Sequence, residues 1–189
     1  MKLLLTGDSI IARYEGLNEP RLNANIEKII ANPQITNTAI SGINSNYLLN
    51  HLDELILNRP LADYVVILIG TNDCAFHKQI PIARFAYNMD LLAKKVLTKY
   101  SAKQLIFISA PAVDEARQRV RDNKTVAKYN GEIEKIAEQY QLHFIDLQKL
   151  MINSELSLTE ICHGLRNDGL HFGQAGYALM ADAIAEIIK

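Results

Sequence analysis

The chain has 189 residues, of which 49% are hydrophobic and 22% charged, and its 20 Lys and Arg against 21 Asp and Glu give a formal net charge of -1. This composition excludes an intrinsically disordered chain, which combines low hydrophobicity with high net charge. It also argues against a nucleic-acid partner, because such partners are usually met by clustered Lys and Arg. The length suits one ordinary domain.

The two cysteines, Cys74 and Cys162, lie far apart and form no CxxC motif. We therefore expect neither a disulfide framework nor a zinc site. The apolar run at residues 3–5 is shorter than the core of a signal peptide, and no segment approaches the roughly 18 apolar residues of a membrane span. These features favour a cytoplasmic protein without a membrane span, and they leave a homo-oligomer open.

Short apolar runs alternate with longer amphipathic segments along the whole chain. The short runs are bounded by Gly, Pro, Asn or Asp and predict strands at 3–6, 35–40, 64–70, 104–110 and 143–147. Apolar residues at three- and four-residue spacing predict helices at about 46–57, 82–100, 126–140 and 179–187.

Two of the predicted strands, 64–70 and 104–110, are continuously apolar, which is typical of strands covered on both faces. The alternation of strands and helices therefore predicts an α/β domain over residues 1–189, with one open, mostly parallel sheet between helices. No repeat, linker or second domain is evident in the sequence.

Small polar residues follow the predicted strands. In an open parallel sheet, ligands bind beyond the carboxyl ends of the strands, so these residues are candidates for a site. Four segments have this position or precede the last helix: Gly7-Asp8-Ser9-Ile10, Ser41-Gly42-Ile43-Asn44, Gly70-Thr71-Asn72-Asp73 and Asp168-Gly169-Leu170-His171.

Together these segments contain what an acyl-transfer site needs. Ser9 is a candidate nucleophile, and His171 can act as its base because an imidazole titrates near neutrality. Asp168, three residues before His171, is close enough to orient the ring. The N–H groups of Ser9 and Gly42 and the amide of Asn72 are candidate donors of an oxyanion hole.

Each segment alone has a simpler interpretation. Gly-Asp-Ser and Gly-Thr-Asn-Asp are common in turns and at helix N-caps. A metal site is a further alternative, with the ligands Asp8, Asp73, Asp168 and His171. It would leave Ser9 unexplained, so we expect no metal and no cofactor.

Residues outside these segments are interpreted as structural. We expect Cys74 to pack near the site, and we assign no role to Cys162 or to His163, which could line the approach to the pocket. Arg117, Arg119 and Arg121 are interpreted as a solvated surface, with a minor chance of contacting an anionic substrate group.

The four segments resemble the sequence blocks of the SGNH hydrolases, also called the GDSL esterase/lipase family. The resemblance spans essentially the whole chain. Within the family, the chain looks most like small bacterial esterases related to isoamyl-acetate-hydrolysing esterase and to lysophospholipase/thioesterase I. It implies a three-layer α/β/α sandwich with a five-stranded sheet of flavodoxin-like order. It also implies Ser9 as nucleophile, with His171 and Asp168 completing a triad and Gly42 and Asn72 completing the oxyanion hole. The first block departs from the family pattern at Ile10, where Leu is usual.

The sequence thus predicts a serine esterase that hydrolyses small carboxylic esters through an acyl-enzyme. A carbohydrate O-deacetylase or an acyltransferase using the same site is the alternative, and a non-catalytic binding module is disfavoured because no member of the site is missing. The balanced charge predicts a neutral ester, recognised by a few donors and not by a strong field, and the short chain predicts an open pocket.

Overall fold

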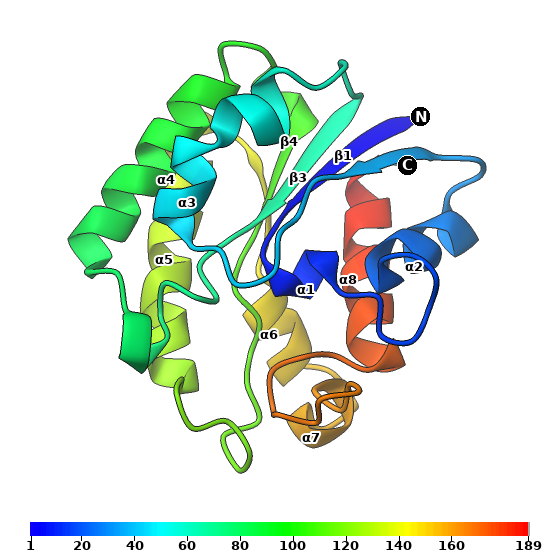
Figure 1. Ribbon diagram of the computed structural model, residues 1–189, viewed down its shortest axis with the longest axis vertical. Helices are drawn as coiled ribbons and strands as arrows, with labels where there is room; N and C mark the ends of the chain where they lie inside the picture. Colours follow the sequence, from blue (N-terminus) through cyan, green and yellow to red (C-terminus); the bar gives the residue numbers. More distant parts are fainter. Residues whose placement is uncertain (189) are drawn as a thin grey trace.

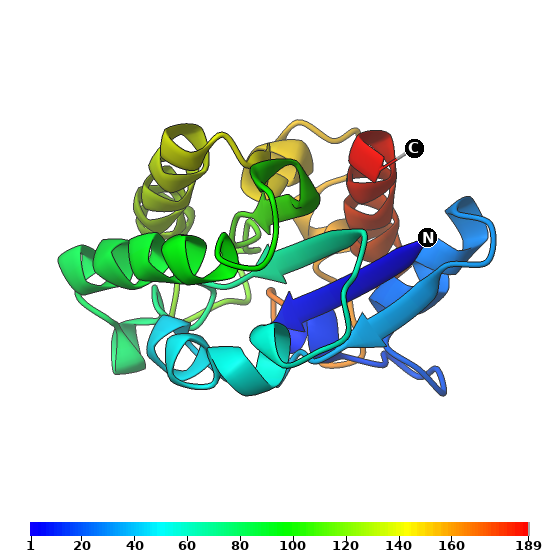
Figure 2. The same ribbon diagram turned by 90° about the horizontal axis from the view of Figure 1, so that it is seen from above.

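The computed structural model describes residues 1–188, and its centre is a sheet of five parallel strands. The strands are β1 (Lys2–Gly7), β2 (Gln34–Asn37), β3 (Tyr64–Leu68), β4 (Leu105–Ile108) and β5 (His143–Ile145). Their order is β2-β1-β3-β4-β5, with every pair parallel. Figure 1 labels the central strands β1, β3 and β4, and Figure 2 shows the arrows of β2, β1 and β3 side by side and pointing the same way. The predicted α/β class and flavodoxin-like order are confirmed.

Helices cover both faces of the sheet. One face carries α1 (Ser9–Ala12), α2 (Arg21–Ile29), α6 (Leu147–Ile152), α7 (Leu158–Ile161) and α8 (Gln174–Ile188). The other carries α3 (Ser45–Asn50), α4 (Ile82–Val96) and α5 (Asn123–Tyr140). Figure 1 shows α3, α4 and α5 on one side of the strands and α2 and α8 on the other.

The core follows from the strand periodicity. Leu3 and Leu5 of β1 pack into the cluster beneath α2 and α8, while Leu4 packs into the cluster beneath α3, α4 and α5. All three side chains are at most 1% exposed. Because alternate residues of a strand point to opposite faces, an uninterrupted apolar run is what a sheet covered on both sides requires.

Several predicted boundaries were wrong by a few residues. The predicted helix 46–57 is α3 followed by a short π-helical segment, Asp53–Leu57, which Asn58 closes by donating its N–H to the Asp53 carbonyl at 2.7 Å. The predicted strand 35–40 ends at Asn37, because the Asn37 side chain accepts the Ala39 N–H at 3.0 Å and turns the chain.

The other predicted strands and helices also differ at their ends. β3 stops at Leu68 instead of residue 70, and β4 is confined to Leu105–Ile108. The regular part of α4 ends at Val96, after which hydrogen bonds of shorter span, such as Thr98 N–H to the Lys95 carbonyl at 3.1 Å, finish the predicted segment to residue 100. Short 3-10 turns at Phe76–Lys78 and Ala102–Gln104 complete the described elements. Within these residues no helix is long and apolar enough to cross a membrane.

Candidate active site

The turn after β1 places Ser9 at the carboxyl edge of the sheet. Asp8 caps α1 by accepting the Ile10 N–H at 2.9 Å, and Ser9 is the first residue of that helix. Gly7 has φ +148°, and a Cβ built on it would lie 2.1 Å from the Leu68 carbonyl oxygen. The close approach of β1 and β3 therefore requires glycine immediately before the Asp8-Ser9 pair.

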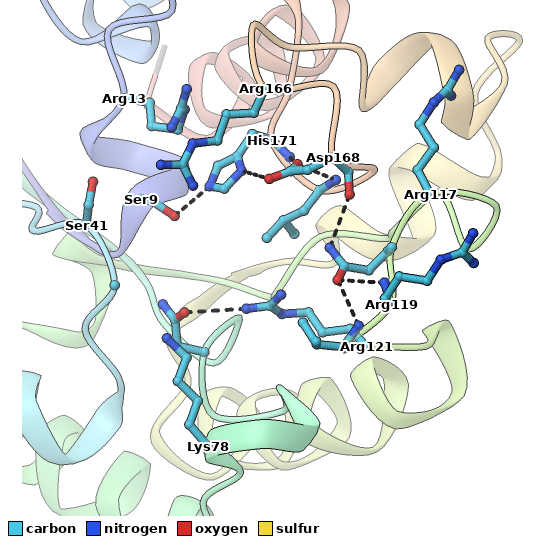
Figure 3. Close-up of a pocket in the computed structure, with 15 residues that line it drawn as sticks. Ser9, Arg13, Ser41, Lys78, Arg117, Arg119, Arg121, Arg166, Asp168 and His171 are labelled. Atoms are coloured by element: carbon cyan, nitrogen blue, oxygen red, sulfur yellow. Dashed lines mark hydrogen bonds and ion pairs between the residues drawn. The ribbon is translucent and has the colours of Figure 1, made fainter.

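Ser9, His171 and Asp168 form a continuous chain of hydrogen bonds, drawn in Figure 3. The Ser9 hydroxyl lies 3.0 Å from His171 Nε2, and His171 Nδ1 lies 2.7 Å from Asp168 Oδ2. A carboxylate can only accept, so Nδ1 carries the proton and Nε2 is left to accept from Ser9. The other oxygen of Asp168 accepts the backbone N–H groups of Leu170 at 3.1 Å and His171 at 3.0 Å, which fixes the carboxylate against the ring.

The protonation states follow from the surroundings. Burial lowers the pKa of His171 below its usual 6.5, and the positive charges of Arg13 and Arg166 lower it further, against the opposing effect of Asp168. Burial raises the pKa of Asp168, but hydrogen bonds from His171 outweigh this, so that the pKa of Asp168 is lowered overall. At neutral pH the site therefore holds a neutral imidazole beside an ionised carboxylate, the states that general-base catalysis requires.

Ser9, Gly42 and Asn72 line one cavity. Within the described residues, the backbone N–H groups of Ser9 and Gly42 make no hydrogen bond. Asn72 donates one amide N–H to the Ile43 carbonyl at 2.8 Å, and its Oδ1 faces Arg121 Nη2 at 3.4 Å. These two contacts define the orientation of the amide and leave its second N–H available.

A buried carboxylate joins the two loops that carry these donors. Asp73 is fully buried, next to Asn72, and accepts the Ser45 N–H at 3.0 Å and the Ser45 hydroxyl in a short hydrogen bond. Asn88 of α4 donates to the same hydroxyl at 2.8 Å. Ser45 lies three residues after Gly42, so Asp73 holds the Gly42 loop against the Asn72 turn.

The cavity has a volume of about 520 Å³ and opens to solvent. In addition to the residues above, six cationic side chains line it: Arg13, Lys78, Arg117, Arg119, Arg121 and Arg166. The sequence predicts a site without a strong positive or negative electrostatic field, because the net charge of the whole chain is close to zero. The lining of this cavity carries more positive than negative side chains, so its local charge differs from the net charge of the chain.

The interpretation of residues 117–121 as a solvated surface was wrong for Arg121. Its side chain is buried, the residue being 7% exposed, and its Nε donates to the Thr71 carbonyl at 2.6 Å. Arg117 and Arg119 are exposed, but both line the cavity. No local signal distinguishes the buried arginine, because its partners lie about fifty residues earlier in the chain.

The remaining candidates take no part in this chemistry. Cys74 packs beside the site, where its thiol donates to the Thr71 carbonyl at 3.4 Å, next to Asn72. Cys74 and Cys162 are buried, and burial raises the pKa of each thiol to about 12, which makes them unreactive at neutral pH. His163 lines a different cavity, beside Gly164.

The alternative metal site is not assembled. Among residues 1–188 no three His, Cys, Asp or Glu side chains are grouped to hold a metal ion. Asp8 caps α1, where burial raises its pKa to about 6, and Asp73 is occupied by Ser45.

The sequence profile of the GDSL-like lipase/acylhydrolase family matches residues 5–179. The chain belongs to this family. The match covers all four sequence blocks, from the turn at Ser9 to the segment containing Asp168 and His171.

Individual relatives agree with this placement. The chain is 23% identical to an isoamyl acetate-hydrolyzing esterase of Saccharomyces cerevisiae, over 100% of this chain and 86% of that protein. A crystal structure of a lipase/acylhydrolase from Enterococcus faecalis has a TM-score of 0.84 and 26% identity, covering 99% of this chain and 94% of the other.

A further relative is considerably longer than this chain. An N-acylneuraminate cytidylyltransferase of Escherichia coli is 27% identical over 86% of this chain, and the match spans 37% of that protein. The chain therefore corresponds to little more than a third of this relative.

Proposed function

We propose that the protein is a serine esterase that hydrolyses small carboxylic esters through an acyl-enzyme on Ser9. The observation that carries this proposal is the hydrogen-bond chain from Ser9 Oγ through His171 to Asp168, at 3.0 and 2.7 Å. Nucleophile, base and orienting carboxylate are connected in the order that nucleophilic catalysis requires. Membership of a lipase/acylhydrolase family supports the reaction class.

The first half-reaction forms the acyl-enzyme. Ser9 Oγ attacks the ester carbonyl carbon while His171 Nε2 takes the hydroxyl proton, and the resulting imidazolium is stabilised by the Asp168 carboxylate. The negative charge on the tetrahedral oxygen is met by the N–H groups of Ser9 and Gly42 and by the Asn72 amide. His171 then returns its proton to the alkoxide, and the alcohol leaves.

Water reverses these steps in the second half-reaction. His171 takes a proton from water and the hydroxide adds to the acyl carbon. The second tetrahedral intermediate then collapses, the carboxylic acid leaves, and His171 returns the proton to Ser9 Oγ. An alcohol or sugar in place of water would make the same site an acyltransferase. The open cavity and the name of the yeast relative, which hydrolyses isoamyl acetate, support small esters.

Hydrolysis of p-nitrophenyl acetate by matched serine variants tests the proposal. Ser9→Ala should remain folded and lose activity by at least about a thousandfold, because nucleophile and base act as a unit. Ser154→Ala, a serine outside the cavity, is the control and should hydrolyse the ester at the wild-type rate. Near wild-type activity of Ser9→Ala would refute the assignment of the nucleophile.

A second arm distinguishes metal-assisted hydrolysis and acyl transfer. Treatment with a chelator should leave the rate unchanged, and a loss that added divalent metal restores would contradict the serine mechanism. Adding an alcohol and measuring transesterification separates an acyltransferase, which would form the new ester preferentially, from a hydrolase, which would form mostly acid.

A further inference from the structure

The cavity at Ser9 concentrates positive charge in a protein whose net charge is -1. Six of the side chains that line it are Arg or Lys, and Asp168, which is hydrogen-bonded to His171, is the only carboxylate in the lining among residues 1–188. In the view of Figure 3, Arg13 and Arg166 lie on one side of Ser9 and Lys78 and Arg121 on the other. A ligand bound at Ser9 would thus meet cations from more than one direction.

Protein carboxylates neutralise only part of this charge. Arg13 is paired with Glu15, and Arg117 Nη1 lies 2.8 Å from Asp114 Oδ2. The other four cations of the cavity form no salt bridge within residues 1–188: Lys78, Arg119, Arg121 and Arg166. A net excess of positive charge therefore remains among the residues that line the cavity.

Arg121 is the most informative of the four, because it is buried. Its Nε donates to the Thr71 carbonyl at 2.6 Å and its Nη2 approaches Asn72 Oδ1 at 3.4 Å, both uncharged acceptors, while its Nη1 makes no hydrogen bond to a described residue. Burial of a guanidinium that forms no salt bridge is costly, and the nearby buried Asp8 carboxylate, whose pKa the charge of Arg121 lowers, offsets part of that cost. A counter-ion that arrives with the ligand would compensate for that cost.

From this charge distribution we infer that the natural substrate is an ester of an anionic molecule, with a carboxylate or phosphate group near the ester that Ser9 attacks. The inference deepens the proposed esterase function and depends on it. Guanidinium groups suit both anions, because their planar donors match two oxygens at once. The expectation of a neutral ester is replaced by this one.

The anion would also favour the chemistry at His171. Arg13 and Arg166 disfavour the imidazolium that forms when His171 takes the Ser9 proton, and they lower the pKa of His171. An anion bound in the cavity would screen both charges and stabilise the protonated ring. The substrate would in this way supply part of the electrostatic balance that the free site lacks.

The test compares acetyl esters that differ only in the substituent at one carbon, which is neutral or anionic. Suitable probes are the 2-O-acetyl esters of methyl glucoside, methyl glucuronoside and methyl glucoside 6-phosphate, which share a ring and an ester but present a neutral, a carboxylate and a phosphate group. We expect kcat/KM to be at least about tenfold higher for one anionic probe than for the neutral one, since each exposed cation contributes about two- to fivefold. The anionic probe with the higher kcat/KM shows whether the substrate carries a carboxylate or a phosphate.

Variants of the exposed cations assign the effect to the cavity. In Arg166→Gln and Arg119→Gln, the ratio of kcat/KM for the anionic probe to that for the neutral probe should fall about two- to fivefold, and Arg166→Lys should restore most of it. Lys103→Gln is the control, because this exposed lysine lies before β4, at the amino edge of the sheet. Its ratio should equal that of the wild type. High salt should reduce the wild-type ratio by screening the charges.

Equal kcat/KM values for the three probes, or an unchanged ratio in both glutamine variants, would overturn the inference while leaving the esterase proposal in place. Hydrolysis of none of the probes and of no p-nitrophenyl acetate would overturn both. The two failures are therefore distinguishable in one set of assays.

Discussion

Removal of the Asp73 carboxylate tests how the fold positions the proposed oxyanion donors. In Asp73→Ala, the buried Ser45 N–H and hydroxyl lose their acceptor. A buried donor left unsatisfied costs about 1–3 kcal/mol, and hydrogen bonds to charged groups contribute about 1.5–3 kcal/mol. Burial raises the pKa of Asp73, so removing the carboxylate also relieves a desolvation cost, and a net destabilisation of about 2–4 kcal/mol is expected.

The same substitution should slow catalysis in the folded protein. The Gly42 loop would lose the Ser45–Asp73 hydrogen bonds and keep the Asn72–Ile43 bond, so that the Gly42 N–H would be held less firmly. Complete loss of one oxyanion donor typically lowers kcat by about 100- to 1,000-fold. Asp73→Asn is a milder change, because its carbonyl accepts the Ser45 N–H and its amide donates to the Ser45 hydroxyl. This variant should recover most of the stability and activity.

Urea denaturation followed by circular dichroism gives the free energy of unfolding, and p-nitrophenyl acetate hydrolysis below the transition gives kcat. Asp90→Ala is the control, since Asp90 on α4 pairs with Lys94 outside the cavity and should not affect kcat. If folded Asp73→Ala retained kcat within twofold of the wild type, the role of Asp73 in holding the donor loop would be refuted.

Two further predictions concern the base and the nucleophile turn. The pKa of His171 is lowered, and the ring must be neutral to act as a base, so the acidic limb of the kcat/KM profile should have its midpoint below pH 6.5. Arg166→Gln should move this midpoint to higher pH, because it removes a positive charge that lowers the pKa of His171. A wild-type midpoint above pH 6.5 would contradict the assignment of His171 as the base. Gly7→Ala should cost at least about 3 kcal/mol of unfolding free energy, since its Cβ would lie 2.1 Å from the Leu68 carbonyl oxygen. Gly131 on α5 is the control, because a Cβ added there meets nothing within 4 Å. Gly131→Ala should raise the free energy of unfolding by up to about 1 kcal/mol. Equal changes in the unfolding free energy of the two variants would contradict the argument.

The sheet could be predicted from the sequence because its determinants are local. Uninterrupted apolar runs such as those of β3 and β4 are required where helices cover both faces, and parallel strands place their following residues at one edge. Ser9 and His171, 162 residues apart, meet there for this reason. The helix α2 was not predicted, although Leu22, Ile26 and Ile29 have helical spacing in the sequence.

The connections around the site could not be predicted in the same way. Two hydrogen bonds at the site, between Ser45 and Asp73 and between Arg121 and Thr71, join segments that are far apart in the sequence. The distance between these segments depends on how the helices that connect the strands pack on the sheet. An arginine that alternates with exposed Arg117 and Arg119 has no local mark of burial. The concentration of charge at the cavity is likewise a property of the fold, and the net charge of -1 concealed it.

Covalent labelling of the nucleophile tests the central claim most directly. The protein would be incubated with a fluorophosphonate, which phosphonylates an activated serine hydroxyl, and the modified peptide identified by mass spectrometry. A single adduct on Ser9, formed in parallel with loss of esterase activity and absent from His171→Ala, is the predicted result. Esterase activity that survives complete modification of Ser9, or inactivation by an adduct on another residue, would contradict the account.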